Sequence, residues 1–225
     1  MLRVRLQEEL ARVERDVLAL GVMVEEAIKA SVDALVRRDR EAAERIIEND
    51  RLINERRFAI ESDILVLIAT QQPIARDLRL LAAMLEIITE LERTGDYAKG
   101  ISRVNLYLGD APLIKPLIDI PLMAQKATDM LHRALKAFAE RDVEAARAIP
   151  REDDEVDALY NRVNEELLHL VIADIKNLEQ ANYLLWAAHN LERAADRVTN
   201  ICERVVFTVT GEMSELDTHF DAGID

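Results

Sequence analysis

Acidic side chains recur in two similar stretches of sequence that lie 100 residues apart. The first stretch, Leu91–Arg103, reads LERTGDYAKGISR, and the second, Leu191–Glu203, reads LERAADRVTNICE. In each stretch a Glu is followed four residues later by an Asp, a spacing that places both carboxylates on one face of a helix. Carboxylates held together in this way bind hard or borderline metal ions, so both stretches are candidate metal sites.

Two further polar pairs come earlier, on what we expect to be the preceding helices. Asp153 and Asp157 are four residues apart, and Asp50 and Asn54 correspond to them in the first half. If the pairs on neighbouring helices face one another, four or five carboxylates converge, and they repel unless a cation neutralises them. The candidate ligands are Asp153, Asp157, Glu192, Asp196 and Glu203 in the second half and Asp50, Glu92 and Asp96 in the first.

The two halves do not offer the same ligands. Asn54 and Arg103 stand where the second half has Asp157 and Glu203, so the first half has fewer anionic side chains. We therefore expect the second-half site to be the better metal site. An all-oxygen ligand set favours Mg, Ca or Mn by softness, and Fe or Zn is also compatible because metal availability decides as well.

Two other interpretations of these acids stay open. The acids could lie on solvated helix faces and pair with Arg93, Arg193 and Arg197, since surface ion pairs of this kind are common. A di-iron enzyme would need two Glu-x-x-His pairs, and only Glu166 and His169 form one. The sequence also lacks a Gly-x-Ser-x-Gly motif, a phosphate-binding glycine-rich loop and a Cys-x-x-Cys pair, so we expect no enzymatic activity.

Composition limits the class of protein. The 225 residues include 6 Gly and 5 Pro, and the abundance of Ala, Leu, Glu and Arg predicts an all-helical fold. The formal net charge of −14 argues against nucleic-acid binding, which needs a basic surface. Cys202 is the single cysteine, no signal peptide is recognisable, and no apolar run is long enough to cross a membrane. We therefore expect a cytoplasmic protein without membrane insertion.

The helices that must position the acids follow from the apolar spacing. The pattern predicts one helix over residues 3–37, a second that begins after the N-cap Asp39 and ends near residue 70, and a third from Pro73 to about residue 108. Pro112, Pro116 and Pro121 predict an extended linker. The helical pattern then restarts, and Pro150 should kink or restart the fifth helix.

The restarted pattern repeats the first half. Residues 27–46 are similar to residues 130–149, and Arg-Asp and Glu-Ala-Ala recur in both at an offset of 103. The later acid stretches recur at an offset of 100, which predicts a three-residue difference in the turn before them. We therefore predict an all-α protein of two tandem, pseudo-symmetric three-helix bundles formed by residues 1–111 and 112–225.

Together these features resemble the PhoU family of accessory regulators of bacterial phosphate-specific transport. The resemblance rests on the duplicated unit, the two LERxxD motifs, the upstream Asp pair, the sequence NICE at Asn200–Glu203 and the sequence TQQPIARDLRLL at Thr70–Leu81. It extends over about residues 5–211.

The resemblance implies a cytoplasmic, non-catalytic regulator. Its expected partners are the ATPase subunit of the phosphate ABC transporter and a phosphate-sensing histidine kinase, and its expected effect is to reduce uptake and starvation signalling. Some family members bind multinuclear iron or zinc clusters on the ExxxD motifs, at positions that match the candidate ligands above. The resemblance also allows a homodimer. A metal-dependent helical-bundle enzyme and a purely structural helical scaffold are the alternatives.

Overall fold

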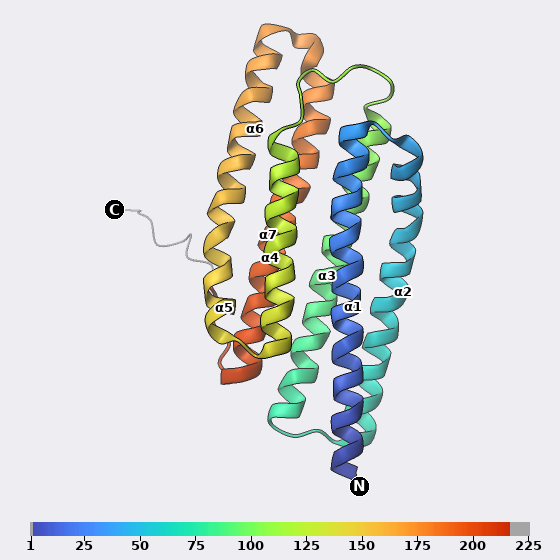
Figure 1. Cartoon of the computed structure of the whole chain (residues 1–225), viewed down its shortest axis with the longest axis vertical. Helices are drawn as coiled ribbons and strands as arrows, with labels where there is room; N and C mark the ends of the chain where they lie inside the picture. Colours follow the sequence, from blue (N-terminus) through green and yellow to red (C-terminus); the bar gives the residue numbers. More distant parts are fainter. Residues whose placement is uncertain (1, 217–225) are drawn as a thin grey trace, which may run out of the picture.

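A computed structural model describes residues 2–216, and these residues form long helices that run along the long axis of the molecule (Figure 1). The first half contains α1 (Leu2–Arg37), α2 (Arg40–Gln71) and α3 (Arg76–Tyr107). The second half contains α4 (Asp119–Glu140), α5 (Val143–Ala148), α6 (Asp153–Ala173) and α7 (Leu178–Thr210), with 3-10 turns at Ile149–Glu152 and Ile175–Asn177. The predicted all-α fold of two repeated helical units is confirmed.

The apolar spacing of the sequence explains the core. On α1, the apolar side chains at three- and four-residue spacing are all buried: Leu6, Leu10, Val13, Val17, Leu20 and Val24. The core that they begin is continuous through both halves, because α1 also packs against α4 and α3 packs against α7. The division at residues 111 and 112 lies in the irregular segment before α4, and as a domain boundary it stays a prediction.

The helix starts show the repeat at the level of single hydrogen bonds. The Asp39 carboxylate accepts from the backbone N–H of Ala42 at 2.9 Å, and the Asp142 carboxylate accepts from that of Ala145 at 3.0 Å. These are N-caps, which satisfy backbone donors that the first turn of a helix leaves open. The two caps are 103 residues apart, so the offset inferred from sequence also holds in the structure.

Prolines account for the differences from the predicted boundaries. Pro73 does not begin α3; it lies buried in the turn before it, and α3 begins at Arg76. Pro121 lies in the first turn of α4 and not in the linker, a position where its missing N–H costs nothing. Pro150 lies in the 3-10 turn between α5 and α6, so the predicted break is confirmed.

Helices α3 and α7 join the halves about a pseudo-two-fold axis. The two helices are antiparallel, because residues nearer the end of α3 contact residues nearer the start of α7. The contacting pairs are Tyr107 with Tyr183, Gly100 with Asn190, Tyr97 with Arg193, Glu90 with Asn200, and Glu86 with Arg204. Exchanging the halves turns the Glu90–Asn200 contact into the Asn190–Gly100 contact. This arrangement fixes the two acid stretches on opposite sides of one central helix pair.

Glu90 is the charged centre of this helix pair. Its carboxylate accepts from Arg197 Nη1 at 3.3 Å, from Asn200 Nδ2 at 3.1 Å and from Arg93 Nη1 at 2.9 Å, and its side chain is 12% exposed. Removal of Glu90 would leave the guanidinium of Arg197 half-buried without this partner, which is more costly than losing an exposed pair.

We predict that Glu90→Ala lowers the free energy of unfolding by roughly 1.5–3 kcal/mol, the range for hydrogen bonds to charged groups. Glu86→Ala is the matched control, because Glu86 lies one turn away on the same helix, pairs with Arg204 at 2.9 Å and is 56% exposed. Its loss should cost less than about 1 kcal/mol. Equal effects of the two substitutions in urea denaturation would contradict this account of the interface.

Candidate metal centre

The second-half acids come from two packed helices, α6 and α7. Asp153 is the first residue of α6, directly after the 3-10 turn that Pro150 imposes, and Asp157 lies one turn further along. Glu192 and Asp196 occupy successive turns of α7. Asp153 is buried, Asp157 and Glu192 are half-buried, and Asp196 is exposed. The four carboxylates thus extend from a buried end to the solvent.

The four acids Asp153, Asp157, Glu192 and Asp196 lie close enough to shift the pKa values of Asp153 and Glu192. Burial, followed by repulsion from Asp196 and Asp157, raises the pKa of Asp153 to about 8. A hydrogen bond with Asp196 and the charge of Glu192 act in the same direction. Burial and the same two aspartates raise the pKa of Glu192 to about 7. The i,i+4 spacing on each helix therefore brings these carboxylates close enough to act on one another, and their assignment as metal ligands stays a prediction.

Buried oxygen atoms at this site lack hydrogen-bond partners. Oδ1 of Asp153 and Oε2 of Glu192 are both inaccessible and accept no hydrogen bond. His189 Nδ1 lies 3.1 Å from Glu192 Oε2 without the direction that a hydrogen bond requires. A buried acceptor without a partner costs free energy, and a cation or a proton would remove that cost.

The donor set fits a metal ion by its chemistry, although the ligands are not pre-arranged. Within residues 5–216, no three His, Cys, Asp or Glu side chains form a group that could already hold a metal ion. A metal ion at this site would have to separate Asp153 from Asp196 and draw both carboxylates toward itself. The convergence of oxygen ligands and the two unsatisfied buried atoms are the features that support such a site.

Glu203 is engaged away from these four acids. Its Oε1 accepts from the backbone N–H of Leu216 at 3.0 Å, and its Oε2 lies 3.5 Å from a guanidinium nitrogen of Arg204. Its assignment as a metal ligand stays a prediction. The Asn200 amide, which the sequence places on the same acidic stripe, donates to Glu90 in the interface between the halves.

The first-half acids also converge, but around a lysine. Asp50 on α2 is buried and accepts from Lys99 Nζ at 2.5 Å and from Asn54 Nδ2 at 3.3 Å. Lys99 Nζ also lies 3.7 Å from Asp96 Oδ1 on α3. Burial, Asp96 and Asp50 raise the pKa of Glu92, and Arg57 opposes them. The first-half site therefore contains a cation of its own.

Lys99 contacts two of the candidate ligands, and the sequence analysis did not single it out. Only acids and arginines were considered as partners for the candidate ligands. The signal was present, because Lys99 is three residues after Asp96 and would share its helix face, whereas the corresponding residue of the second half is the buried Thr199. Comparing the two stretches position by position would have found this difference.

The neighbouring arginines mainly contact residues other than the candidate ligands. Arg93 and Arg197 both pair with Glu90, and the Arg193 guanidinium lies 5.7 Å from the centre of the Tyr97 ring. Arg193 still lowers the pKa of Glu192, but less than the neighbouring acids raise it. The ion pairs of Arg93 and Arg197 thus go to Glu90, while Arg93 and Arg193 act on Glu92 and Glu192 through their charge.

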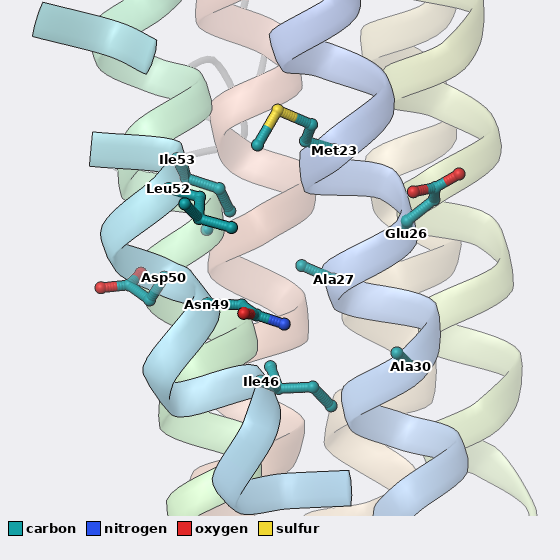
Figure 2. A pocket seen from close by; sticks show the side chains of 10 residues that line it. Met23, Glu26, Ala27, Ala30, Ile46, Asn49, Asp50, Leu52 and Ile53 are labelled. Carbon is teal, nitrogen blue, oxygen red and sulfur yellow. The ribbon is translucent and has the colours of Figure 1, made fainter. Parts of the chain in front are cut away.

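A groove of about 260 Å³ opens beside Asp50, between α1 and α2 (Figure 2). Its walls are mostly apolar and include Met23, Ala27 and Ile53, and Figure 2 shows Asp50 pointing away from α1. Among the described residues that line it, Glu26 and Asp50 carry negative charge and none is Lys or Arg. The groove therefore offers no cation that could bind phosphate.

Comparisons with known proteins agree with this architecture. The PhoU domain model matches residues 17–104 and 120–205, which are the two halves of the repeat. The "Phosphate-specific transport system accessory protein PhoU homolog" of Clostridium acetobutylicum is 34% identical over 96% of this chain and all of its own. The "Phosphate-specific transport system accessory protein PhoU" of Escherichia coli is 33% identical over 91% of this chain and 85% of its own.

Solved structures show the same fold. The crystal structure of the phosphate transport system regulatory protein PhoU from Streptococcus pneumoniae superposes with a TM-score of 0.86 at 32% identity, and covers 93% of this chain and 99% of its own. PhoU from Pseudomonas aeruginosa gives a TM-score of 0.87 at 29% identity, with coverage of 92% and 99%. The protein is thus a duplicated helical-bundle protein of the type found in phosphate transport systems. It belongs to the PhoU domain family, so the resemblance seen in the sequence is confirmed.

The raised pKa values predict how stability depends on pH without metal. In the folded protein Asp153 has a pKa of about 8 instead of the ordinary 3.8 for Asp. Glu192 has a pKa of about 7 instead of the ordinary 4.5 for Glu. Unfolding between these limits releases protons, so stability falls as pH rises from about 4 to 8, and each unit of difference in pKa is worth about 1.4 kcal/mol.

In the presence of chelator, the doubly substituted Asp153→Asn, Glu192→Gln protein should lose less stability than the unmodified protein between pH 5 and 8. Between pH 5 and 8, the melting temperature of the unmodified protein should fall by at least about 4 °C more than that of the doubly substituted protein. Glu165→Gln, at an exposed position of α6, is the control and should follow the unmodified protein. Parallel pH profiles for all three proteins would show that the four carboxylates do not interact as described.

Proposed function

We propose that this protein is an accessory regulator of phosphate-specific transport and acts by binding other proteins. The observation that carries the proposal is the match to proteins named phosphate-specific transport system accessory proteins over more than 90% of the chain, with both halves included. The relatives are named as accessory or regulatory proteins, which agrees with a role that requires no catalysis.

The proposed partners are the ATPase subunit of the phosphate ABC transporter and the phosphate-sensing histidine kinase. Binding to them would reduce uptake and repress starvation genes when phosphate is plentiful. We place the protein in the cytoplasm, where the ATPase subunit and the kinase domain would use ATP. Among residues 2–216, no helix combines the length and the apolar character that crossing a bilayer requires. A homodimer is part of the proposal, with the long helices as the available surfaces.

The proposed metal site is the second-half acid cluster of Asp153, Asp157, Glu192 and Asp196. The support is the convergence of these carboxylates and the buried, unsatisfied oxygens of Asp153 and Glu192. Iron or zinc, as a multinuclear cluster, would supply the positive charge that stabilises the ionised carboxylates, with Glu203 as a further ligand. The cluster would hold α6 to α7 and so set the shape presented to a partner.

The regulatory role can be tested in a bacterium that lacks its own PhoU-family gene and carries a phosphate-starvation reporter. Expression of this protein should restore repression of the reporter at high phosphate, because the transporter and the kinase would again be restrained. A Glu90→Ala variant, which weakens the joint between the halves, should restore less. A reporter that stays fully derepressed although the unmodified protein is present and folded would contradict the proposed role.

The metal site can be tested by elemental analysis and by calorimetry. Protein purified without chelator or affinity metal should contain iron or zinc, and Asp153→Asn should weaken binding at least about tenfold, since even indirect partners of a metal contribute that much. Glu165→Gln on the exposed side of α6 should bind like the unmodified protein. Equal metal content in the unmodified protein and the Asp153→Asn protein would place the metal elsewhere.

A further inference from the structure

The two acidic sites differ in one position that lies at their centre. Lys99 follows Asp96 by three residues, and the residue that corresponds to it in the second half is Thr199. The acids on either side are related by the repeat: Asp50 corresponds to Asp153, and the Glu-Asp pair of α3 corresponds to that of α7. The same constellation therefore exists once with a lysine and once without one.

The Lys99 ammonium lies between carboxylates of two different helices. It is 2.5 Å from Asp50 Oδ2 on α2 and 3.7 Å from Asp96 Oδ1 on α3. The Lys99 side chain is 24% exposed and that of Asp50 is 6% exposed, so the contact is largely shielded from water. An ammonium is a compact charge with three donors and no acceptor. It therefore places positive charge beside Asp50 Oδ2 and Asp96 Oδ1, where a metal ion bound by the same carboxylates would also lie.

Two arginines near the first-half site also act on Glu92 through their charge, but their ion pairs are with other carboxylates. Arg57 lies 3.1 Å from Glu61, and Arg93 pairs with Glu90. The contacts of Lys99 thus mark it as the cation that bridges α2 and α3 at this site. One oxygen, Asp50 Oδ1, is buried and accepts no hydrogen bond, so a ligand atom is available there if the lysine is removed.

We propose that Lys99 serves as the permanent counter-ion of the first-half site and prevents metal binding there, so that the chain binds a divalent cation in its second half only. The lysine makes the α2–α3 joint independent of ions. The α6–α7 joint, with Thr199 in that position, depends on an added cation. One half of a duplicated protein is thereby fixed, and the other half responds to metal.

This inference rests on the proposed metal site of the second half, and exchanging the two residues separates the two claims. Four full-length proteins are compared by native mass spectrometry and calorimetry with Mn²⁺ as the probe: the unmodified protein, Lys99→Thr, Lys99→Arg and Thr199→Lys. The unmodified protein and Lys99→Arg should bind Mn²⁺ in the second half only. Lys99→Thr should gain a site, and Thr199→Lys should lose the site that the unmodified protein has.

The outcomes distinguish the claims. If the unmodified protein binds no Mn²⁺ but Lys99→Thr binds it, the second-half site is refuted and the role of Lys99 stands. If Lys99→Thr binds no more Mn²⁺ than the unmodified protein, the role of Lys99 is refuted, whatever the second half does. If Thr199→Lys keeps the Mn²⁺ affinity of the unmodified protein, a lysine at this position does not exclude metal and the proposal is also overturned.

A stability measurement covers the case in which Lys99→Thr folds poorly. Without Lys99, Asp50 and Asp96 repel at a largely buried position, so this variant should melt at a lower temperature than Lys99→Arg in chelator. Excess Mn²⁺ should raise its melting temperature more than that of Lys99→Arg. A Lys99→Thr protein that is destabilised or unfolded in chelator and is not restored by Mn²⁺ would overturn the proposal.

Discussion

The structure depends on how like charges are held together at two helix joints. Asp50, Glu92 and Asp96 meet between α2 and α3, and the second-half acids meet between α6 and α7. Carboxylates at such positions repel one another and resist burial, so each joint needs positive charge or protons. The first joint contains Lys99, whereas at the second the pKa of Asp153 is raised to about 8 and two buried oxygens, Asp153 Oδ1 and Glu192 Oε2, accept no hydrogen bond, although His189 Nδ1 lies 3.1 Å from the latter. The same helical unit is thus neutralised in two different ways.

The central helix pair explains why these two joints can differ without disturbing each other. Helices α3 and α7 cross about a pseudo-two-fold axis, and Glu90, Arg197 and Asn200 link them through a largely buried set of hydrogen bonds. The acid pairs of α3 and α7 lie on the faces turned toward α2 and α6. A change at one joint therefore acts on its own helix pair first and can reach the other half through the contacts of α3 with α7 and of α1 with α4.

Most of the fold could be predicted from the sequence, because apolar spacing, the Asp39 cap and the repeated segments all act locally. The prediction that α3 begins at Pro73 was wrong, since α3 begins at Arg76. Proline suits both the first turn of a helix and a buried turn, and only tertiary packing decides between these positions. The convergence of Asp153, Asp157, Glu192 and Asp196 followed from helical spacing on two neighbouring helices. The hydrogen bond of Asn200 to Glu90 could not be predicted in this way, because the acidic face of α7 also borders the other half of the protein. Comparing the two acid stretches would have shown that Lys99 replaces Thr199, but only the structure shows the Lys99 ammonium beside Asp50.

The central claim is that the α6–α7 carboxylates require a cation and the α2–α3 carboxylates already have one. The most direct measurement is anomalous X-ray diffraction from crystals of the unmodified protein grown with Mn²⁺. The account predicts an anomalous peak within bonding distance of Asp153, Asp157, Glu192 or Asp196, and none beside Asp50, where Lys99 remains. A peak beside Asp50, or crystals saturated with Mn²⁺ that show none between α6 and α7, would contradict it.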